Sequence, residues 1–342
     1  MKRILVIYTG GTIGMARLGT GGALVPVDFN QLYGLIPELN ELEAEIHFQS
    51  WQTPLDSTQM TPDHWAKLAI QIFENHPYYD GFVVLHGSDT MAFTASALSF
   101  MLQNLGKPVI LTGSQLPVNI IRTDGKENLL TSIEIALLSD DFGRPLINEV
   151  CIYFEYKLYR GNRTYKHSSN SFKAYNSPNY PLLGEAGLEL RIYTQYLLTK
   201  TSEPVRLYPK CDSNILNISL FPGINFKWIR QAIDNAPQLK ALILLTYGSG
   251  NAPIDTELKA MLKVLGDRNI PVINISQCKS GSVVMGKYEV SQWLLDYNVI
   301  SGYDMTREAA ITKAMCILPY VQGIGPFKDT FQNPISGELT LK

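Results

Sequence analysis

The feature that most constrains the fold of this chain is a pattern that repeats along it. A short apolar run is followed by a polar loop containing glycine and then by a stretch with helical periodicity. The clearest copy has the apolar run 82–85, the loop 86–90 and an amphipathic stretch 91–105, followed by Gly106 and Pro108. Strand, loop and helix in this order predict an α/β fold.

A length of 342 residues exceeds what one hydrophobic core usually serves, since domains average about 150 residues. The pattern weakens over residues 175–212, where prolines are frequent and periodicity is low, as is typical of a linking segment. We therefore expect a larger N-terminal α/β domain with a mixed sheet over 1–190. A linker over 191–213 and a smaller C-terminal α/β domain with a parallel sheet over 214–342 should follow.

Charge and cysteine usage exclude several classes of protein. Lys and Arg number 29 against 31 Asp and Glu, so no basic field is expected to hold nucleic acid. The amino terminus has too short an apolar run for a secretory signal, and no stretch approaches the ~18 apolar residues of a membrane span. The four cysteines are far apart, without a CxxC pair, which favours neither a metal site nor a disulfide framework. A cytoplasmic protein without a membrane partner is expected.

Three polar loops follow predicted strands, at residues 9–14, 51–61 and 86–90. In open α/β sheets, ligands bind beyond the carboxyl ends of the strands, which makes these loops the first candidates for a site. They supply hydroxyls at Thr12, Ser57, Thr58, Ser88 and Thr90 and carboxylates at Asp56 and Asp89.

A hydroxyl nucleophile needs a group that accepts its proton. His86 is the histidine beside a candidate loop, but no Ser-His-Asp arrangement or GxSxG motif accompanies it. A lysine whose pKa is lowered by burial is an alternative base. Lys166 lies just past the predicted strand 150–154, in the kind of loop that such a base requires.

Each feature also has a structural interpretation. A Gly-Gly turn such as Gly10-Gly11 is, by itself, more often a tight turn or a phosphate cradle, although the GxGxxG and GxxxxGK[ST] motifs are missing. Residues 88–90 could equally cap the following helix. Taken singly, Lys166 is more often a surface lysine, His86 a structural histidine and Cys278 a buried small residue.

The motifs in combination resemble those of the bacterial type I (cytoplasmic) L-asparaginases, and the likeness runs from residue 3 to about residue 340. The motifs that carry it are Tyr8-Thr9-Gly10-Gly11-Thr12-Ile13-Gly14-Met15, Pro54-Leu55-Asp56-Ser57, His86-Gly87-Ser88-Asp89-Thr90-Met91-Ala92, Thr112-Gly113-Ser114-Gln115, Arg160-Gly161-Asn162-Arg163-Thr164, Tyr247-Gly248-Ser249-Gly250-Asn251-Ala252-Pro253 and Gln277-Cys278-Lys279-Ser280-Gly281.

The resemblance implies an amidohydrolase that converts L-asparagine to L-aspartate and ammonia without a cofactor. Thr12 would form an acyl-enzyme ester. Ser88, Asp89 and Lys166 would relay protons, and Asp89 would also face the substrate's α-ammonium. The α-amino and α-carboxylate ends of asparagine would be held by Asp56, Ser57 and Thr58, through charge-assisted hydrogen bonds.

Three positions depart from the family pattern. Leu24 stands where a tyrosine is common, in a glycine-containing segment, 14–26, that could close over the site as a lid. Ser88 stands where the family usually has threonine. Leu245 stands where some members have an arginine in a second, regulatory asparagine site, which would include Ser276, Gln277 and Cys278. Without that cation we expect little or no allosteric activation.

In this family one subunit completes the pocket of its neighbour, and Asn251 is the residue here that would reach across. We expect a homodimer, which could double to a tetramer. Two other functions stay open at this point. A glutamine amidotransferase subunit of the same fold normally carries an extra amino-terminal domain, whereas the nucleophile strand here begins at residue 3. An amino-acid sensor would need neither the nucleophile nor the relay.

Overall fold

The computed structural model describes residues 1–17, 24–26, 34, 36–286 and 289–341. The chain forms two compact units, Met1–Pro209 and Lys210–Lys342. Each unit has its own sheet and its own core, and each is described by itself.

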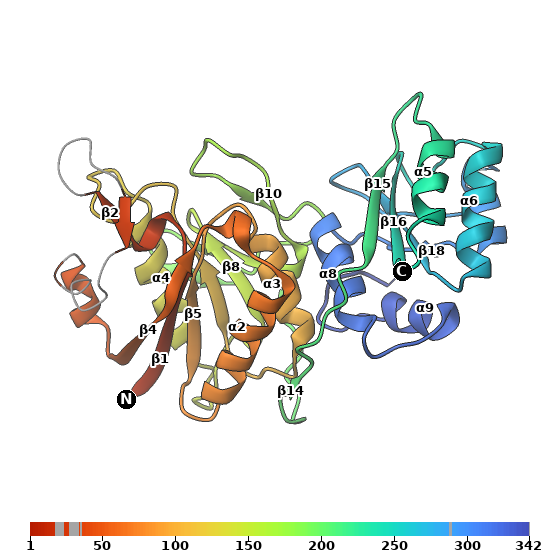
Figure 1. Ribbon diagram of the computed structural model, residues 1–342. Coiled ribbons are helices and arrows are strands. Elements are labelled where there is room, and N and C mark those ends of the chain that lie inside the picture. Colours follow the sequence, from red (N-terminus) through yellow and green to blue (C-terminus); the bar gives the residue numbers. More distant parts are fainter. Residues whose placement is uncertain (18–23, 27–33, 35, 287–288, 342) are drawn as a thin grey trace. The chain divides into compact units, whose positions relative to one another are not determined.

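The first unit is built on a mixed sheet, as the sequence predicts (Figure 1). The strands β8, β7, β5, β1 and β4 pair in parallel, and β9, β12 and β13 extend the sheet antiparallel beyond β8. In spatial order the strands are β13 (Leu190–Ile192), β12 (Gly184–Ala186), β9 (Lys157–Arg160), β8 (Val150–Phe154), β7 (Val109–Thr112), β5 (Gly81–Leu85), β1 (Lys2–Gly10) and β4 (Ala44–Leu55).

Helices cover both faces of this sheet (Figure 1). The helix α4 (Gly125–Leu137) packs on the face that carries Ile4, Val6 and Tyr8 of β1, in one apolar cluster. The helices α2 (Pro62–Asn75) and α3 (Met91–Met101) lie on the opposite face. Strands buried on both faces are apolar throughout, which is why β1, β5 and β7 appear as continuous apolar runs.

The helix α3 is shorter than its periodicity predicts. It ends at Met101, and Leu102–Gln103 form the strand β6, which pairs with β14 (Arg206–Leu207). Pairing with a segment about a hundred residues further along the chain is a tertiary effect that local periodicity does not contain. Shorter elements of this unit include η1 (Thr12–Gly14), β2 (Met15–Arg17) with β3 (Leu24–Pro26), η3 (Pro37–Glu41), η5 (Gly161–Arg163) and η6 (Thr194–Tyr196).

The second unit has a parallel sheet in the order β15 (Ile215–Ser219), β16 (Ala241–Thr246), β17 (Val272–Ser276) and β18 (Ile300–Ser301), as the sequence predicts. The helices α5 (Phe226–Asp234) and α6 (Thr256–Asp267) pack on one face. The helices α8 (Arg307–Ile317) and α9 (Ile324–Gln332) pack on the other. Two more elements, α7 (Glu289–Gln292) and η7 (Trp293–Tyr297), precede β18.

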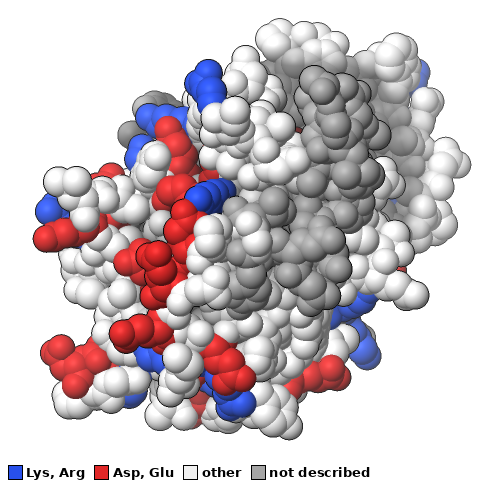
Figure 2. Space-filling model, turned by 90° about the vertical axis from the view of Figure 1, so that its left-hand side faces the viewer, with Lys and Arg blue, Asp and Glu red and all other residues white. Residues whose placement is uncertain are grey.

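The surface view shows the sign of the charge on one face of the molecule. Acidic side chains gather in a band there, with Lys and Arg set singly around it (Figure 2). Among the helices in the described part of the chain, none is both long and apolar enough to cross a membrane.

Candidate active site

The three candidate loops follow adjacent strands, so they meet at one edge of the sheet. The strand β1 lies between β4 and β5. Gly10 at the end of β1 is in register with Leu55 of β4, and Tyr8 is in register with Leu85 of β5. The strands are parallel, so the loops after β1, β4 and β5 all leave the same edge.

Two glycines let the loops touch backbone to backbone. A β-carbon at Gly10, which has φ 140°, would lie 1.9 Å from the carbonyl oxygen of Leu55. One at Gly11, with φ 89°, would lie 2.5 Å from the backbone nitrogen of Gly87. Neither distance leaves room for a side chain. The Gly-Gly pair therefore sets Thr12 beside the loop that carries Ser88 and Asp89.

A third glycine joins the remaining loop to this pair. A β-carbon at Gly87 would lie 2.7 Å from the hydroxyl oxygen of Ser57. Ser57 begins the short 3-10 helix η4 (Ser57–Gln59), directly after β4. The tight turn that the sequence left open as a structural explanation is real, but its effect is to bring three polar loops together.

Thr12 begins the short 3-10 helix η1, and hydrogen bonds to the preceding carbonyl fix the conformation of this turn. The carbonyl of Gly11 accepts hydrogen bonds from the Gly14 N–H at 3.3 Å and from the Tyr8 phenol at 3.1 Å. Burial raises the pKa of Tyr8 to about 12, so the phenol keeps its proton as a donor. Thr12 is half-buried, and its hydroxyl has no hydrogen-bond partner among the described residues. Within the described part of the chain, this hydroxyl is open to a substrate.

Lys166 contacts both polar side chains of the loop after β5. Its ammonium donates to the Ser88 hydroxyl at 2.9 Å and to the Asp89 carboxylate at 2.7 Å. The Lys166 side chain is 17% exposed, whereas that of Asp89 is 56% exposed. Lys166 is therefore mostly buried, unlike a solvated surface lysine. The arrangement joins a charge, a hydroxyl and an accessible carboxylate, which is what a proton relay needs.

Tyr175 holds Lys166 in place, and the sequence analysis missed it. The short strands β10 (Tyr165–Lys166) and β11 (Tyr175–Asn176) pair so that Lys166 faces Tyr175 across the hairpin. The phenol of Tyr175 donates to the carbonyl of Ser88, and its ring meets Phe154 edge-on at 5.1 Å between centroids. Burial, and then the nearby charge of Asp89, raise the pKa of Tyr175 well above its ordinary value. Its segment lacks periodicity, so no sequence signal marks it.

The loop after β4 presents a carboxylate and a buried hydroxyl. Thr58 donates to the Asp56 carboxylate from its backbone at 2.8 Å and from its hydroxyl at 2.6 Å, and these bonds lower the pKa of Asp56. Ser57 is buried, and its hydroxyl oxygen accepts from the Asp89 N–H at 3.2 Å. The Thr90 hydroxyl donates to the Ser57 carbonyl at 2.7 Å and makes no capping bond to α3. Thr90 thus joins loops rather than capping a helix.

His86 has a structural role. It is fully buried, and its ring contacts the Gly87 carbonyl at 2.7 Å and the Thr94 hydroxyl at 2.9 Å. Burial lowers the pKa of His86 to about 4. The neutral ring packs beneath the loop 86–90 and takes no part in the proton relay of Lys166 and Ser88.

The loop after β7 also reaches the Thr12 turn, through the start of α4. A β-carbon at Gly125 would lie 3.1 Å from Ser114 and 3.3 Å from the side chain of Ile13. The carboxylate of Asp124 accepts from the backbone N–H of Gln115 at 2.9 Å, and burial raises its pKa. Asp124 was not predicted; the signal for it was the Thr-Asp-Gly sequence directly before a helix.

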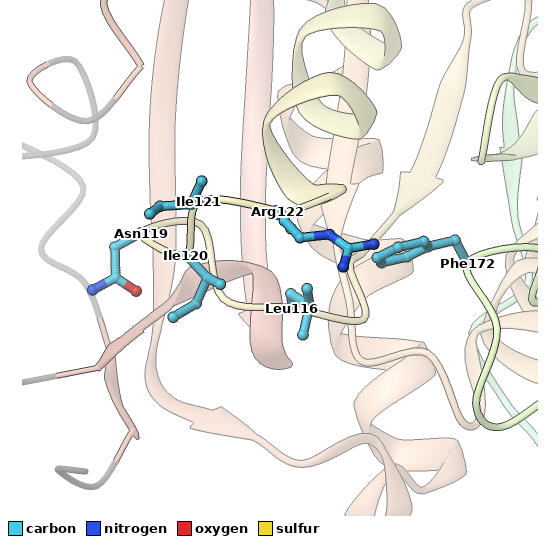
Figure 3. Close-up of a pocket in the computed structure, with 6 residues that line it drawn as sticks. All are labelled: Leu116, Asn119, Ile120, Ile121, Arg122 and Phe172. Carbon is cyan, nitrogen blue, oxygen red and sulfur yellow. The ribbon is translucent and has the colours of Figure 1, made fainter. Parts of the chain in front are cut away.

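A pocket opens beside this loop (Figure 3). Its volume is about 670 Å³. Phe172 comes from the turn of the hairpin that carries Lys166, and Arg122 points toward its ring. The lining residues are Leu116, Asn119, Ile120, Ile121, Arg122 and Phe172. The pocket thus joins the loop after β7 to the Lys166 hairpin.

In the second unit, the predicted residues lie at the carboxyl ends of β16 and β17 or in the loops that follow them. Asn251 forms an isolated bridge with Tyr247, and its side-chain oxygen is buried without a hydrogen-bond partner in the described part of the chain. The carboxamide of Gln277 donates to the carbonyls of Leu220 at 2.7 Å and Leu245 at 2.9 Å. The Gln277 side chain therefore has a structural role, because its carboxamide is hydrogen-bonded to backbone carbonyls.

The residues predicted for a regulatory site differ in what they offer a ligand. The Leu245 side chain is 7% exposed and packs in the core beneath α8 and α9. The Ser276 hydroxyl is bound to the Gly248 carbonyl, and the N–H of Cys278 donates to that hydroxyl at 3.0 Å. Cys278 itself is exposed, contrary to its interpretation as a buried small residue. The four predicted residues are uncharged, and the exposed Lys279 follows Cys278 directly.

The predicted lid lies mostly outside the described residues. Leu24 pairs with Arg17 across β2 and β3, but residues 18–23 and the Leu24 side chain are not among those the structure describes. The lid therefore stays a prediction. Throughout the described residues, His, Cys, Asp and Glu side chains nowhere gather as a set of three that could hold a metal ion.

Comparisons with known proteins cover both units. The family "Asparaginase, N-terminal" matches residues 3–197, and the family "Glutaminase/Asparaginase C-terminal domain" matches residues 214–330. L-asparaginase 1 of Escherichia coli is 41% identical over 99% of this chain and 98% of that protein. The crystal structure of L-asparaginase I from Vibrio cholerae superposes with a TM-score of 0.88 at 41% identity, over 99% of each chain. The thermostable L-asparaginase from Thermococcus kodakarensis has a TM-score of 0.88 at 31% identity, over 99% of this chain and 100% of that one.

Proposed function

The chain belongs to the asparaginase family, and we propose that it hydrolyses the side-chain amide of L-asparagine through a covalent ester on the Thr12 hydroxyl. The overall reaction gives L-aspartate and ammonia. The observation that carries the proposal is the pair of contacts from Lys166 to Ser88 and Asp89, in loops that Gly11 and Gly87 hold against the Thr12 turn.

In the first step the Thr12 oxygen attacks the side-chain carbonyl of asparagine. A carbon–oxygen bond forms, the carbon–nitrogen bond breaks, and the hydroxyl proton reaches the leaving nitrogen, which departs as ammonia. Thr12 suits this role because its β-methyl restricts the hydroxyl to few orientations. The Ser88 hydroxyl and the neutral Lys166 amine, 2.9 Å apart, carry the proton: the amine accepts it by way of the hydroxyl and passes it to the leaving nitrogen.

In the second step water attacks the ester and releases aspartate. One water proton returns to the Thr12 oxygen, so the site is restored after each turnover. The same relay serves both steps, because Lys166 and Ser88 stay hydrogen-bonded beneath the substrate. Asp89 holds the Lys166 side chain in position through its carboxylate at 2.7 Å.

Asp56, Ser57, Thr58 and Asp89 form the clamp for the amino-acid end of the substrate. The lowered pKa of Asp56 keeps its carboxylate ionised, which suits an α-ammonium group. Asp89 is more than half exposed and has a free face for the same group. The Ser57 hydroxyl is the donor for the α-carboxylate, and Thr58, whose hydroxyl donates to Asp56 at 2.6 Å, holds the Asp56 carboxylate in place.

The remaining parts of the proposal concern assembly and regulation. The protein works in the cytoplasm as a homodimer or a dimer of dimers, in which Asn251 of one subunit completes the pocket of another. With Leu245 in the core, the rate should depend hyperbolically on asparagine concentration.

The test is ammonia release from L-asparagine by the purified protein and two variants. Thr12→Val keeps the shape of the side chain but lacks the hydroxyl, and Thr12→Ser keeps the hydroxyl. We expect the first to lose nearly all activity, on the order of 10³-fold or more, and the second to retain measurable activity. Brief mixing of the active protein with asparagine, followed by a rapid acid quench, should trap the ester on Thr12. Mass spectrometry detects the trapped ester. Equal rates for wild type and Thr12→Val would refute the mechanism.

Glutamine is the substrate that separates the two enzymatic alternatives. One additional methylene changes transition-state binding by only about 1–3 kcal/mol, so a residual glutaminase rate is compatible with the proposal. A rate with glutamine that exceeds the rate with asparagine would favour an amidotransferase role. Binding of asparagine without ammonia release would favour a sensor.

A further inference from the structure

Two cysteines that are 105 residues apart in the sequence meet in the second unit. The sulfur atoms of Cys211 and Cys316 are 3.3 Å apart, and both thiols are free. Cys211 lies next to the boundary with the first unit, and Cys316 lies in the last turn of α8. Their spacing in the sequence shows no paired-cysteine motif, so the fold alone reveals the pair.

Backbone contacts on both sides hold the two cysteines together. The N–H of Asp212 donates to the carbonyl of Met315 at 2.9 Å, which places the residues directly after Cys211 and directly before Cys316 side by side. The N–H of Lys210 donates to the Tyr320 phenol at 3.0 Å. The closeness of the two thiols therefore comes from the backbone. Bonding requires the sulfurs to approach from 3.3 Å to about 2.05 Å.

The two thiols differ in access. Cys211 is partly exposed, whereas Cys316 is buried. The hydrogen bond with Cys211, together with burial, raises the pKa of Cys316 well above its ordinary value. An oxidant in solution thus meets Cys211 first, and Cys316 follows as the resolving thiol. Of the other two cysteines, Cys151 is buried and Cys278 is exposed, and neither has a sulfur partner among the described residues.

We propose that Cys211 and Cys316 form a reversible intramolecular disulfide when the protein meets a low-molecular-weight disulfide such as oxidised glutathione. The Cys211 thiolate attacks one sulfur of oxidised glutathione, forms a mixed disulfide and releases one reduced glutathione. The Cys316 thiolate then attacks the Cys211 sulfur and releases the second. Two protein thiols are oxidised, one glutathione disulfide is reduced to two thiols, and the protons of the cysteines pass to the leaving thiolates.

The bond would attach the segment that enters β15 to α8, the helix beneath the sheet of the second unit. It closes a loop of more than a hundred residues, and cross-links over long loops restrict the unfolded chain most. We expect the melting temperature to rise by roughly 5–10 °C on oxidation and to return on reduction.

The experiment counts thiols after incubation of the full-length protein with oxidised glutathione. Cys278→Ser is made first, because the exposed Cys278 would react by itself; three of the four cysteines then remain. We expect denatured, oxidised protein to show one free thiol, from Cys151, with no bound glutathione and no cross-linked dimer on a non-reducing gel. Three remaining thiols, a stable glutathione adduct, or a disulfide between chains would each overturn the proposal.

Two further variants in the Cys278→Ser background test the order of events. Adding Cys316→Ser should leave Cys211 as a lasting mixed disulfide with glutathione, detected by intact mass. Adding Cys211→Ser should protect Cys316, so that both remaining thiols stay reduced. Neither variant should show the rise in melting temperature. Equal reaction of Cys316 in the absence of Cys211 would contradict the assigned roles, and an unchanged melting temperature in the fully oxidised Cys278→Ser protein would contradict the stabilising effect.

Discussion

Each unit of this protein contains a lysine paired with a carboxylate, and the two pairs differ in almost every other respect. In the first unit, Lys166 pairs with Asp89, whose side chain is more than half exposed. In the second, Lys313 of α8 pairs with Glu338, and both side chains are 0% exposed. The Lys313 ammonium also donates to the carbonyls of Phe331 and Asn333, each at 2.7 Å.

The surroundings show what each pair does. Glu338 accepts from the N–H groups of Ile335 at 2.9 Å and Ser336 at 2.8 Å, so every polar group of the buried pair is occupied by the protein. Around Lys166 the partners are a hydroxyl and an accessible carboxylate, which a substrate can reach. A buried pair with all its hydrogen bonds made fixes a chain segment, whereas a partly open pair exchanges protons.

The first prediction tests the partly exposed pair of Lys166 and Asp89, which we call the open pair. Replacing Lys166 by Met should lower kcat by about 10²–10⁴-fold, because the relay loses the amine that accepts the proton and the Ser88 hydroxyl loses its partner. The melting temperature should change little, since a pair this exposed contributes only about 0–1 kcal/mol to stability. Ammonia release and calorimetry measure the two effects. A large loss of stability with unchanged kcat would show that this pair is structural as well.

The second prediction tests the buried pair of Lys313 and Glu338, which we call the closed pair. Glu338→Gln leaves the Lys313 ammonium buried without an anion, which should lower the free energy of unfolding by about 3–5 kcal/mol. At low temperature the folded protein should keep its kcat. Unfolding in urea measures the first effect and ammonia release the second. The double variant Lys313→Met with Glu338→Gln removes both charges and should recover much of the loss; a double variant as unstable as Glu338→Gln would argue against an uncompensated charge.

The third prediction asks whether burial, rather than closeness to the site, decides the role of a titratable group. His86 lies in the loop of the open pair but is buried like the closed pair, with its pKa lowered from 6.5 to about 4. Between these pH values the unfolded state binds more protons than the folded state. Stability should therefore fall as the pH drops from about 6.5 to about 4, by up to about 3 kcal/mol.

His86→Asn supplies the matched comparison, because its amide can still donate to the Gly87 carbonyl but does not titrate. Urea unfolding at several pH values should show a smaller loss over this window for the variant than for the wild type. Identical pH profiles for the two proteins would rule out His86 as the source of the loss of stability between pH 6.5 and pH 4.

The smallest predicted effect concerns the residue that aligns the open pair. Tyr175→Phe keeps the ring contact with Phe154 and loses the hydrogen bond to the Ser88 carbonyl. Losing one such bond costs about 1 kcal/mol, so kcat should fall about 3- to 10-fold while KM changes less. Initial rates over a range of asparagine concentrations separate the two constants. A change confined to KM would place Tyr175 in substrate binding instead.

Local patterns in the sequence were sufficient for much of the fold and for the candidate site. Apolar runs followed by glycine loops predicted the strands β1, β5, β7 and β16 and their class of sheet, because burial on both faces demands apolar residues throughout. The family resemblance grouped Ser88, Asp89 and Lys166, and these three side chains meet in the structure. Their roles, and that of Asn251, stay proposals until the variants are measured.

Tertiary structure decided whatever depends on residues distant in the sequence. The early end of α3, the bond from Tyr175 to Ser88, and the buried Lys313 pair each join segments that share no local pattern. Cys211 and Cys316 show this best, since four scattered cysteines indicated no pairing until the fold set two sulfurs 3.3 Å apart. Periodicity and turn chemistry are local properties of a chain, whereas the contacts that orient and modify a site form only when its segments pack together.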